Sequence, residues 1–136
     1  MLPYQRFSET FPRAMVLMGP KIYGEFGITA QQARALREIG NGPITGGELS
    51  ARFGVKLPAA ARLLRRLEEK GWVTKAQDKI DRRVFWLELT PEGALFKDKL
   101  QTKREEVIKA MFDKLTPREQ EEVAKGIELL LKSLKI

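Results

Sequence analysis

The clearest hydrophobic pattern in the chain lies between about residues 58 and 70. Its apolar positions recur at i, i+3, i+4 and i+7, and they are Ala60, Leu63, Leu64 and Leu67. This spacing places them on one face of an α-helix. Three cations fall on the other side of the same stretch, namely Arg62, Arg65 and Arg66. The pattern predicts a helix from about Pro58 to Lys70 that buries a leucine stripe and presents arginines to solvent.

After Gly71 the period of the pattern changes from 3.6 to 2. The segments WVTKA (72–76) and RVFWLEL (83–89) each predict a strand, and QDKID between them is too long for a two-residue turn. Phe85 is expected to tie the second strand to the core. Because neighbouring residues of a strand point to opposite faces, Arg82 and Arg83 are expected to diverge. We therefore expect a two-stranded wing whose tip, at about 77–83, is basic.

Threonines mark the starts of the other helices. Three of them have a Gln or Glu three residues later, as a capping box requires, in the pairs Thr29 with Gln32, Thr45 with Glu48, and Thr116 with Glu119. Prolines follow Thr90 and Thr116, where a first helical position tolerates them. These signals predict helices over about 30–39, 46–53, 91–114 and 117–134.

The first helical region is harder to define. Apolar residues extend from about Phe11 to Phe26, but Pro12, Gly19 and Pro20 predict a helix that is short or kinked. Two long helices at the C-terminal end carry more apolar surface than a small winged core can cover. We therefore expect a second copy of the chain to cover part of that surface.

Composition limits the classes of function. With 136 residues and 43% hydrophobic content, one compact domain is expected. The absence of cysteine and histidine excludes disulfides, Cys or His zinc sites, thiol sensing and Ser/His triads, so we expect no metal and no cofactor. No motif places a nucleophile beside a base, so an enzyme has little support. No apolar run reaches the roughly 18 to 20 residues of a membrane span, and an acid comes too early for a secretory signal. A cytoplasmic protein is expected.

The positive charge is concentrated in one part of the chain. Residues 56–83 hold nine Lys or Arg against four acids, which is +5 of the total net charge of +7. An excess of cations confined to one segment is typical of a surface that binds a polyanion, although a solvated charged face would have the same composition.

Together these pieces resemble a known family. The segments GITAQQARAL, GPITGGELSARFGVKLPAAARLLRRLEEKGWV, DKIDRR, LELTPEG and LTPREQEEV follow one another in the order found in the MarR family of transcription regulators. The resemblance covers about residues 25–136, and Asp-Arg-Arg followed by L-T-x-x-G is its most specific part. It implies one mostly α-helical domain, 1–136, with a winged helix-turn-helix lobe at 28–90 and dimerisation helices at 1–27 and 91–136.

The resemblance and the charge pattern both indicate double-stranded DNA as the partner. The second helix of the motif would enter the major groove and the wing the minor groove. The expected contacts are Lys56, Ala59, Arg62, Arg65, Arg66, Lys75, Lys79, Asp81, Arg82 and Arg83. Asp81 is expected to orient Arg83, and Arg65 and Arg66 to bind phosphates or to pair with Glu69 and Asp81. Lysine and alanines at positions 56, 59 and 61, where the family usually has hydroxyls, predict sparse reading of bases.

The family also implies a homodimer, more often a repressor, and leaves open a small-molecule effector that releases DNA. Residues that could line its pocket are Met15, Met18, Tyr23, Phe26, Arg34, Arg37 and Phe96, although Met and aromatic residues are more often core. A second hypothesis is a winged-helix module that docks on another protein of a transcription complex through an exposed Trp86. DNA binding that depends on salt would separate these two functions.

Overall fold

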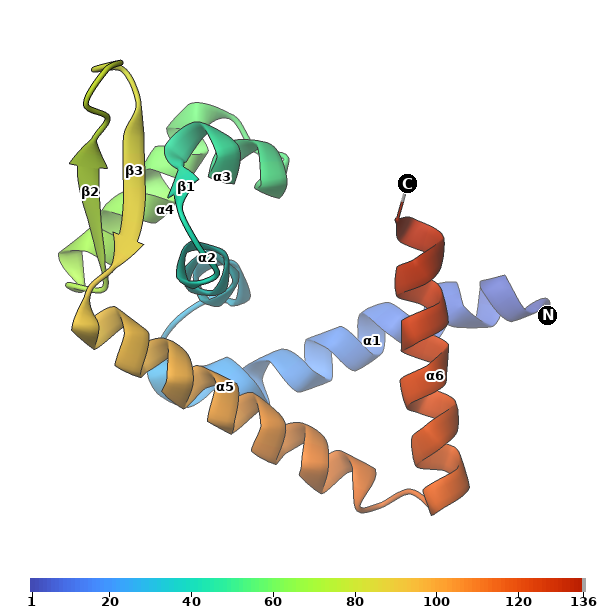
Figure 1. Cartoon of the computed structure of the whole chain (residues 1–136). Coiled ribbons are helices and arrows are strands. Elements are labelled where there is room, and N and C mark those ends of the chain that lie inside the picture. Colours follow the sequence, from blue (N-terminus) through green and yellow to red (C-terminus); the bar gives the residue numbers. More distant parts are fainter. Residues whose placement is uncertain (136) are drawn as a thin grey trace. The chain divides into compact units, whose positions relative to one another are not determined.

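The computed structural model describes residues 1–135 of the protein (Figure 1). The chain divides into two compact units, Met1–Thr102 and Lys103–Ile136. The elements of the first unit are α1 (Pro3–Tyr23), the 3-10 helix η1 (Gly24–Phe26), α2 (Ala30–Gly40), β1 (Ile44–Thr45), α3 (Gly46–Phe53), α4 (Leu57–Glu69), β2 (Val73–Gln77) and β3 (Phe85–Leu89). Helix α5 (Pro91–Phe112) begins in the first unit and ends in the second, which also contains α6 (Pro117–Leu134). Within the described residues, no helix is long and apolar enough to cross a membrane.

The threonine signals mark the helix starts as predicted. At Thr29 the hydroxyl accepts the amide of Gln32 at 3.1 Å, and the Gln32 side chain accepts the amide of Thr29 at 3.0 Å. Thr116 and Glu119 form the same reciprocal pair, whereas Thr45 accepts from the amide of Glu48 without a return bond. These bonds satisfy amides that the first turn of a helix leaves without partners.

The predicted bounds of the first helix, and the prediction that it is short, are wrong. Helix α1 is 21 residues long, begins at Pro3 rather than near Phe11, and contains both Pro12 and Pro20. A proline at the first helical position is tolerated, and the Gln5 side chain accepts the amide of Leu2 at 2.8 Å, so the sequence did contain a start signal. Each internal proline removes one backbone hydrogen bond and makes the helix less stable there without ending it.

The wing belongs to a three-stranded antiparallel sheet rather than a two-stranded one. Its order is β1-β3-β2, with Ile44 opposite Leu87 and Val73 opposite Leu89. β1 has only two residues, which is too short to show an alternating pattern, so the sequence did not reveal it. β3 begins at Phe85, so Arg82 and Arg83 both lie in the loop 78–84 and the predicted strand alternation does not apply to them.

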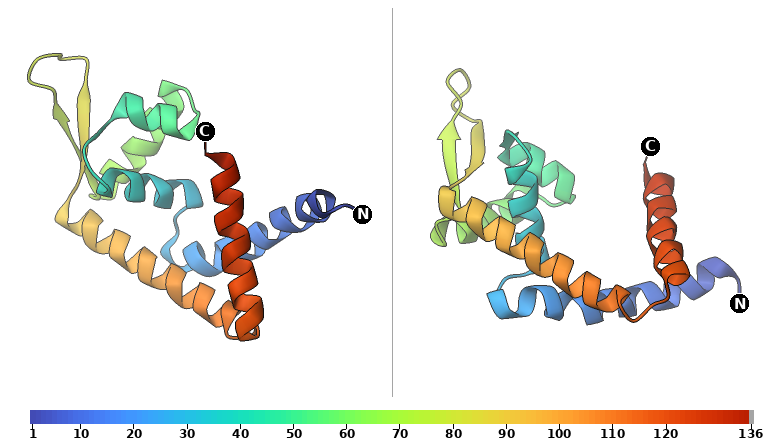
Figure 2. Two further views of the ribbon diagram at one scale, coloured as in Figure 1. Left: turned by 45° about the vertical axis from the view of Figure 1, so that its right-hand side comes forward. Right: turned by 60° about the horizontal axis from the view of Figure 1, so that its bottom comes forward.

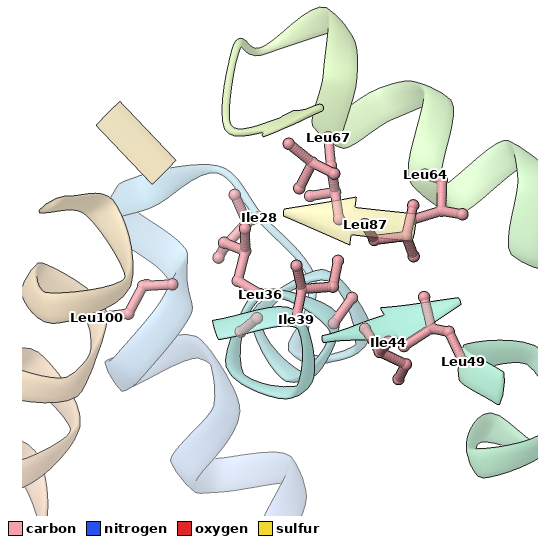
Figure 3. Close-up of a cluster of buried hydrophobic side chains, with 12 residues drawn as sticks. Ile28, Leu36, Ile39, Ile44, Leu49, Leu64, Leu67, Leu87 and Leu100 are labelled. Atoms are coloured by element: carbon pink, nitrogen blue, oxygen red, sulfur yellow. The ribbon is translucent and has the colours of Figure 1, made fainter. Parts of the chain in front are cut away.

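The core of the first unit lies between α2, α3, α4 and the sheet (Figure 3). Its most deeply buried large side chains come from all of these elements and are Leu36, Ile44, Leu49, Leu67 and Leu87. The stripe predicted on α4 is confirmed, since Ala60, Leu64 and Leu67 are buried and Leu63 packs against the core cluster. Burial of this stripe fixes which face of α4 points to solvent.

The start of α5 is held closely against the segment before β2. The amide of Thr90 donates to the carbonyl of Trp72 at 3.0 Å, and the Thr90 hydroxyl accepts the amide of Gly93 at 2.9 Å. A Cβ on Gly93 would lie 2.0 Å from the Trp72 carbonyl oxygen. Three residues later in the same helix the ring of Phe96 is stacked on Trp72, with centroids 3.9 Å apart. The glycine of the L-T-x-x-G signature is thus required by the close approach of two backbones.

The second unit is formed by the end of α5, the turn after it and α6. The Gln120 side chain donates to the carbonyls of Phe112 at 3.0 Å and Leu115 at 3.2 Å and so closes the turn. Several apolar side chains of α6 are exposed, namely Val123, Ile127, Leu129, Leu131 and Leu134. An exposed apolar surface of this kind is typical of a helix that meets another protein chain.

Candidate nucleic-acid interface

The turn between α3 and α4 is fixed by local hydrogen bonds. Helix α3 ends at Phe53 and is capped by Gly54, whose φ of 62° lies in the left-handed region that favours glycine. The hydroxyl of buried Ser50 donates to the carbonyl of Val55 at 2.6 Å, and the amide of Val55 donates to the Ser50 carbonyl at 3.2 Å. Sequence reasoning missed Ser50, although a serine shortly before a glycine turn is a recognisable signal. These bonds set the angle at which α4 leaves the turn.

The solvent face of α4 carries three exposed arginines, Arg62, Arg65 and Arg66. The predicted pairing of Arg65 and Arg66 with Glu69 and Asp81 is wrong, because within residues 1–135 no carboxylate lies within 4.0 Å of these guanidinium groups. Asp81 pairs with Arg83 instead. An exposed helix with several unneutralised guanidinium groups has donors available for phosphates and for guanine edges.

The residues at the start of α4 have different environments. Lys56 occupies the N-cap position and its side chain forms no capping bond. Ala59 is half-buried, whereas Ala61 is exposed. The helix therefore begins without the hydroxyl that usually caps it. The start of α4 presents the Lys56 cation, the Leu57 side chain and the Ala61 methyl group to solvent.

In the wing loop, Asp81 holds Arg83 by two parallel side-chain hydrogen bonds, as predicted. Arg83 donates through Nε to Asp81 Oδ1 and through Nη2 to Oδ2, both at 3.1 Å, and its backbone amide donates to Oδ1 at 3.0 Å. These bonds, the side-chain pair first, hold the pKa of the Asp81 carboxyl below its ordinary value. The Arg83 side chain is still 90% exposed, so its cation is oriented and remains accessible.

Sequence reasoning missed Asp78 and misjudged Trp86. The Asp78 carboxylate accepts hydrogen bonds from the amides of Asp81 at 2.9 Å and Ile80 at 3.0 Å, and from the indole Nε1 of Trp86 at 2.9 Å. The amide of Asp81 and then the Trp86 indole lower the pKa of Asp78. Trp86 is half-buried, so it is not the exposed docking residue that the second hypothesis required. The sequence D-K-I-D contained the signal, since an aspartate commonly accepts amides two and three residues later in a turn.

Of the other predicted wing residues, Lys75 lines a groove at the base of the wing, whereas Lys79 and Arg82 lie in the loop beyond it. Lys75 on β2 pairs with Glu68 on α4 at 3.2 Å, while Lys79 and Arg82 are exposed in the loop. A groove of about 370 Å³ lies between the base of the wing and the start of α4, and Leu57, Lys75, Arg83 and Phe85 are among its lining residues. The prediction that Phe85 ties β3 to the core is wrong, because Phe85 is 43% exposed and Leu87 occupies the core instead.

The two views in Figure 2 show the β2–β3 hairpin projecting beyond the helices of its lobe. Its tip is formed by the loop 78–84, where Ile80 is 95% exposed. The basic loop and the arginine face of α4 therefore belong to one compact unit. A projecting basic loop beside an exposed basic helix has the arrangement that groove-binding winged helices need.

The residues predicted for an effector pocket do not form one cluster. Phe26 and Phe96 meet edge to face with centroids 5.5 Å apart, and Tyr23 packs against the same core. Arg34 instead lies over the ring of Phe53 at 4.2 Å and donates to the Arg52 carbonyl at 2.9 Å. Met18 is half-buried, and two other predicted residues, Met15 and Arg37, are exposed. The structure adds Trp72, which the sequence reasoning had not included, to the aromatic group.

Comparison with known proteins agrees with this geometry. The sequence profile of the MarR family matches residues 26–84. The chain is 31% identical over 102 residues to the uncharacterised HTH-type transcriptional regulator YsmB of Bacillus subtilis, covering 74% of this chain and 70% of YsmB. The chain belongs to the MarR family. It is therefore a transcriptional regulator of the winged helix-turn-helix type.

Solved structures of MarR proteins superpose on nearly the whole chain. Wild-type MarR from E. coli in its apo form has a TM-score of 0.79 and 28% identity, with 99% of each chain covered. A mutant MarR from E. coli complexed with operator DNA has a TM-score of 0.76 and 28% identity, covering 98% of this chain and 95% of that one. The MarR fold of this chain thus includes the helices on both sides of the winged lobe.

Proposed function

We propose that the protein is a homodimeric, sequence-specific regulator that binds double-stranded DNA, with α4 in the major groove and the wing loop in the minor groove. The observation that carries this proposal is the combination of three arginines without carboxylate partners on the face of α4 with an oriented, exposed arginine in the wing. The MarR structure complexed with operator DNA supports the same partner. Docking of the module on protein alone is disfavoured by the family and by the half-buried Trp86.

Each cation has a proposed role. Arg62 lies nearest the start of α4 and reads a guanine through two hydrogen bonds, while Arg65, Arg66 and Lys56 contact phosphates. In the wing, Arg83 enters the minor groove, where narrow A/T-rich sequence concentrates negative potential. Alanines at positions 59 and 61 offer only methyl groups. Affinity therefore depends mainly on phosphate contacts and on groove shape.

Dimerisation is assigned to the two ends of the chain, 1–27 and 91–136, and DNA binding to the lobe 28–90. Support comes from apolar side chains that are exposed on α1 and α6, including Phe7, Val16, Leu17 and Leu131. A two-fold dimer would present two α4 helices to half-sites about one turn of DNA apart, roughly 34 Å. By the tendency of the family the protein acts as a repressor. It works in the cytoplasm, where the DNA is, and has no enzymatic activity.

An effector site is a separate part of the proposal. The edge-to-face ring pair of Phe26 and Phe96 lies where α5 meets the winged lobe. A small apolar or aromatic molecule bound there would change the spacing of the two recognition helices and release DNA. Tyr23, another of the residues predicted for the pocket, packs against the same hydrophobic core as this ring pair.

Selection of bound duplexes from a random pool tests this function. We expect the selected sequences to contain an A/T-rich inverted repeat whose half-sites are separated by about one helical turn. Sedimentation of the protein with a selected duplex should show two chains per duplex. Recovery of unrelated sequences, or of single half-sites bound by one chain, would contradict the proposed dimeric reading of DNA.

A further inference from the structure

The loop that carries Arg83 is closed by several hydrogen bonds although it is largely exposed. At its base the amide of Asp78 donates to the Val84 carbonyl at 2.8 Å, and the Gln77 side chain donates to the Arg82 carbonyl at 2.9 Å. Inside the loop the amide of Val84 donates to the Asp81 carbonyl at 3.0 Å. Loops of this length usually lose considerable conformational entropy when they bind a ligand, and internal bonds reduce that cost in advance.

Asp78 is the point at which the loop is connected to the sheet. One of its carboxylate oxygens, Oδ2, accepts both loop amides, those of Ile80 and Asp81. The other, Oδ1, accepts the indole of Trp86. Asp81, whose amide is fixed in this way, in turn holds the guanidinium of Arg83. A continuous set of hydrogen bonds therefore runs from Trp86 through Asp78 and Asp81 to the wing cation.

Trp86 is well placed to hold Asp78. It lies on β3, the central strand, opposite Thr45 of β1 and Ala76 of β2. Its large ring is half-buried on this sheet, so the indole N–H has a fixed position and direction. A hydrogen bond from a fixed donor to a carboxylate is stronger and more directional than one between neutral groups.

We propose that Trp86 and Asp78 are positioning residues, which hold the wing loop in the conformation that presents Arg83 to DNA. Neither side chain needs to touch DNA for this role. The inference rests on the proposed function, because it concerns how Arg83 of the same interface is placed. It also explains why an aromatic residue with a hydrogen-bond donor stands at the base of the wing.

The matched variants are Trp86→Phe and Trp72→Phe. Both replace an indole by a phenyl ring in the same lobe, but the Trp72 ring stacks on Phe96 at the start of α5, and within residues 1–135 its indole donates no hydrogen bond to the wing. Each variant is made in the wild-type background and together with Arg83→Ala. Binding to a fluorescently labelled, A/T-rich duplex is measured by fluorescence anisotropy. The midpoint of thermal unfolding is recorded for each variant.

We expect W86F to weaken binding about fivefold in the wild-type background, which is the net value of about one hydrogen bond. In the R83A background W86F should have no further effect, because the cation that it positions is absent. W72F should bind DNA as wild type does. A merely structural role for Trp86 would weaken binding equally in both backgrounds.

Amide hydrogen exchange without DNA gives an independent readout. W86F should accelerate exchange at Ile80 and Asp81, and W72F should not. Unchanged exchange at both amides, unchanged binding, or equal weakening with and without Arg83 would each overturn the inference. If the wild-type protein binds no duplex, the proposed function fails, and the exchange data then decide by themselves whether Trp86 orders the loop.

Discussion

Replacing Gly93 by alanine tests the close contact between α5 and the winged lobe. The added Cβ would lie 2.0 Å from the Trp72 carbonyl oxygen and 2.8 Å from the Trp72 carbonyl carbon. An ordinary contact begins at 3.4 Å, so the two backbones would have to separate by more than 1 Å. That separation would stretch the 3.0 Å hydrogen bond from the Thr90 amide to the same carbonyl.

The expected loss of stability is the balance of three contributions. Overpacking against groups that cannot rotate away costs about 1 to 3 kcal/mol and sometimes more. A strained backbone hydrogen bond adds about 1 kcal/mol. Alanine in place of glycine returns up to about 1 kcal/mol through helix propensity. We therefore expect Gly93→Ala to lower the free energy of unfolding by about 1 to 4 kcal/mol.

Gly47→Ala is the matched control. Gly47 also lies in the first turn of a helix that starts at a threonine cap, but the nearest atom to its added Cβ is 3.9 Å away. The Gly47→Ala variant should have an unchanged free energy of unfolding, or one raised by up to about 1 kcal/mol. Urea unfolding followed by circular dichroism at one fixed protein concentration measures both variants. Equal stability of the two variants would refute the argument from the close approach at Trp72.

Three other predictions concern the wing and the core. Arg83→Ala should weaken duplex binding by about 1 to 3 kcal/mol while the urea midpoint stays unchanged, and undiminished binding in a fluorescence titration would remove the wing from the interface. Leu67→Ala, at a side chain with 0% exposure, should lower the free energy of unfolding by about 2 to 5 kcal/mol in urea. For Asp78, whose pKa is lowered in the folded protein, the charged form stabilises the fold above its ordinary pKa of 3.8, and this contribution is lost as the pH falls through the lowered value. Asp78→Asn should therefore be less stable than wild type at about pH 7, and the difference should become smaller as the pH falls below 3.8, which urea titrations over this pH range would detect.

The elements that were predicted well are those whose conformation follows from the side chains of the segment itself, without contacts to distant parts of the chain. The leucine stripe of α4 has a full helical period, and the threonine caps satisfy the amides next to them, so both were visible in the sequence. The start of α1 was misjudged because internal prolines were given more weight than Pro3 and Gln5. Strand β1 has two residues and owes its conformation to pairing with β3, which a local pattern does not contain.

The sequence predicted which residues belong to the site better than it predicted the hydrogen bonds between them. The cations and the pairing of Asp81 with Arg83 followed from motif and charge. The bond from Trp86 to Asp78 joins residues eight positions apart across the wing, and it depends on the length and path of a loop. Phe85 was assigned to the core on alternation alone, whereas the core at that edge is already filled by Leu87.

The dependence of duplex binding on salt tests the central claim most directly. The logarithm of the association constant for a fluorescent A/T-rich duplex is measured against the logarithm of the salt concentration. Each neutralised phosphate contributes a slope of about −0.9, so the arginines and lysines of α4 and the wing predict a slope of about −3 or steeper. A shallower slope, or the absence of salt-sensitive binding, would contradict a phosphate-binding interface on this face of the protein.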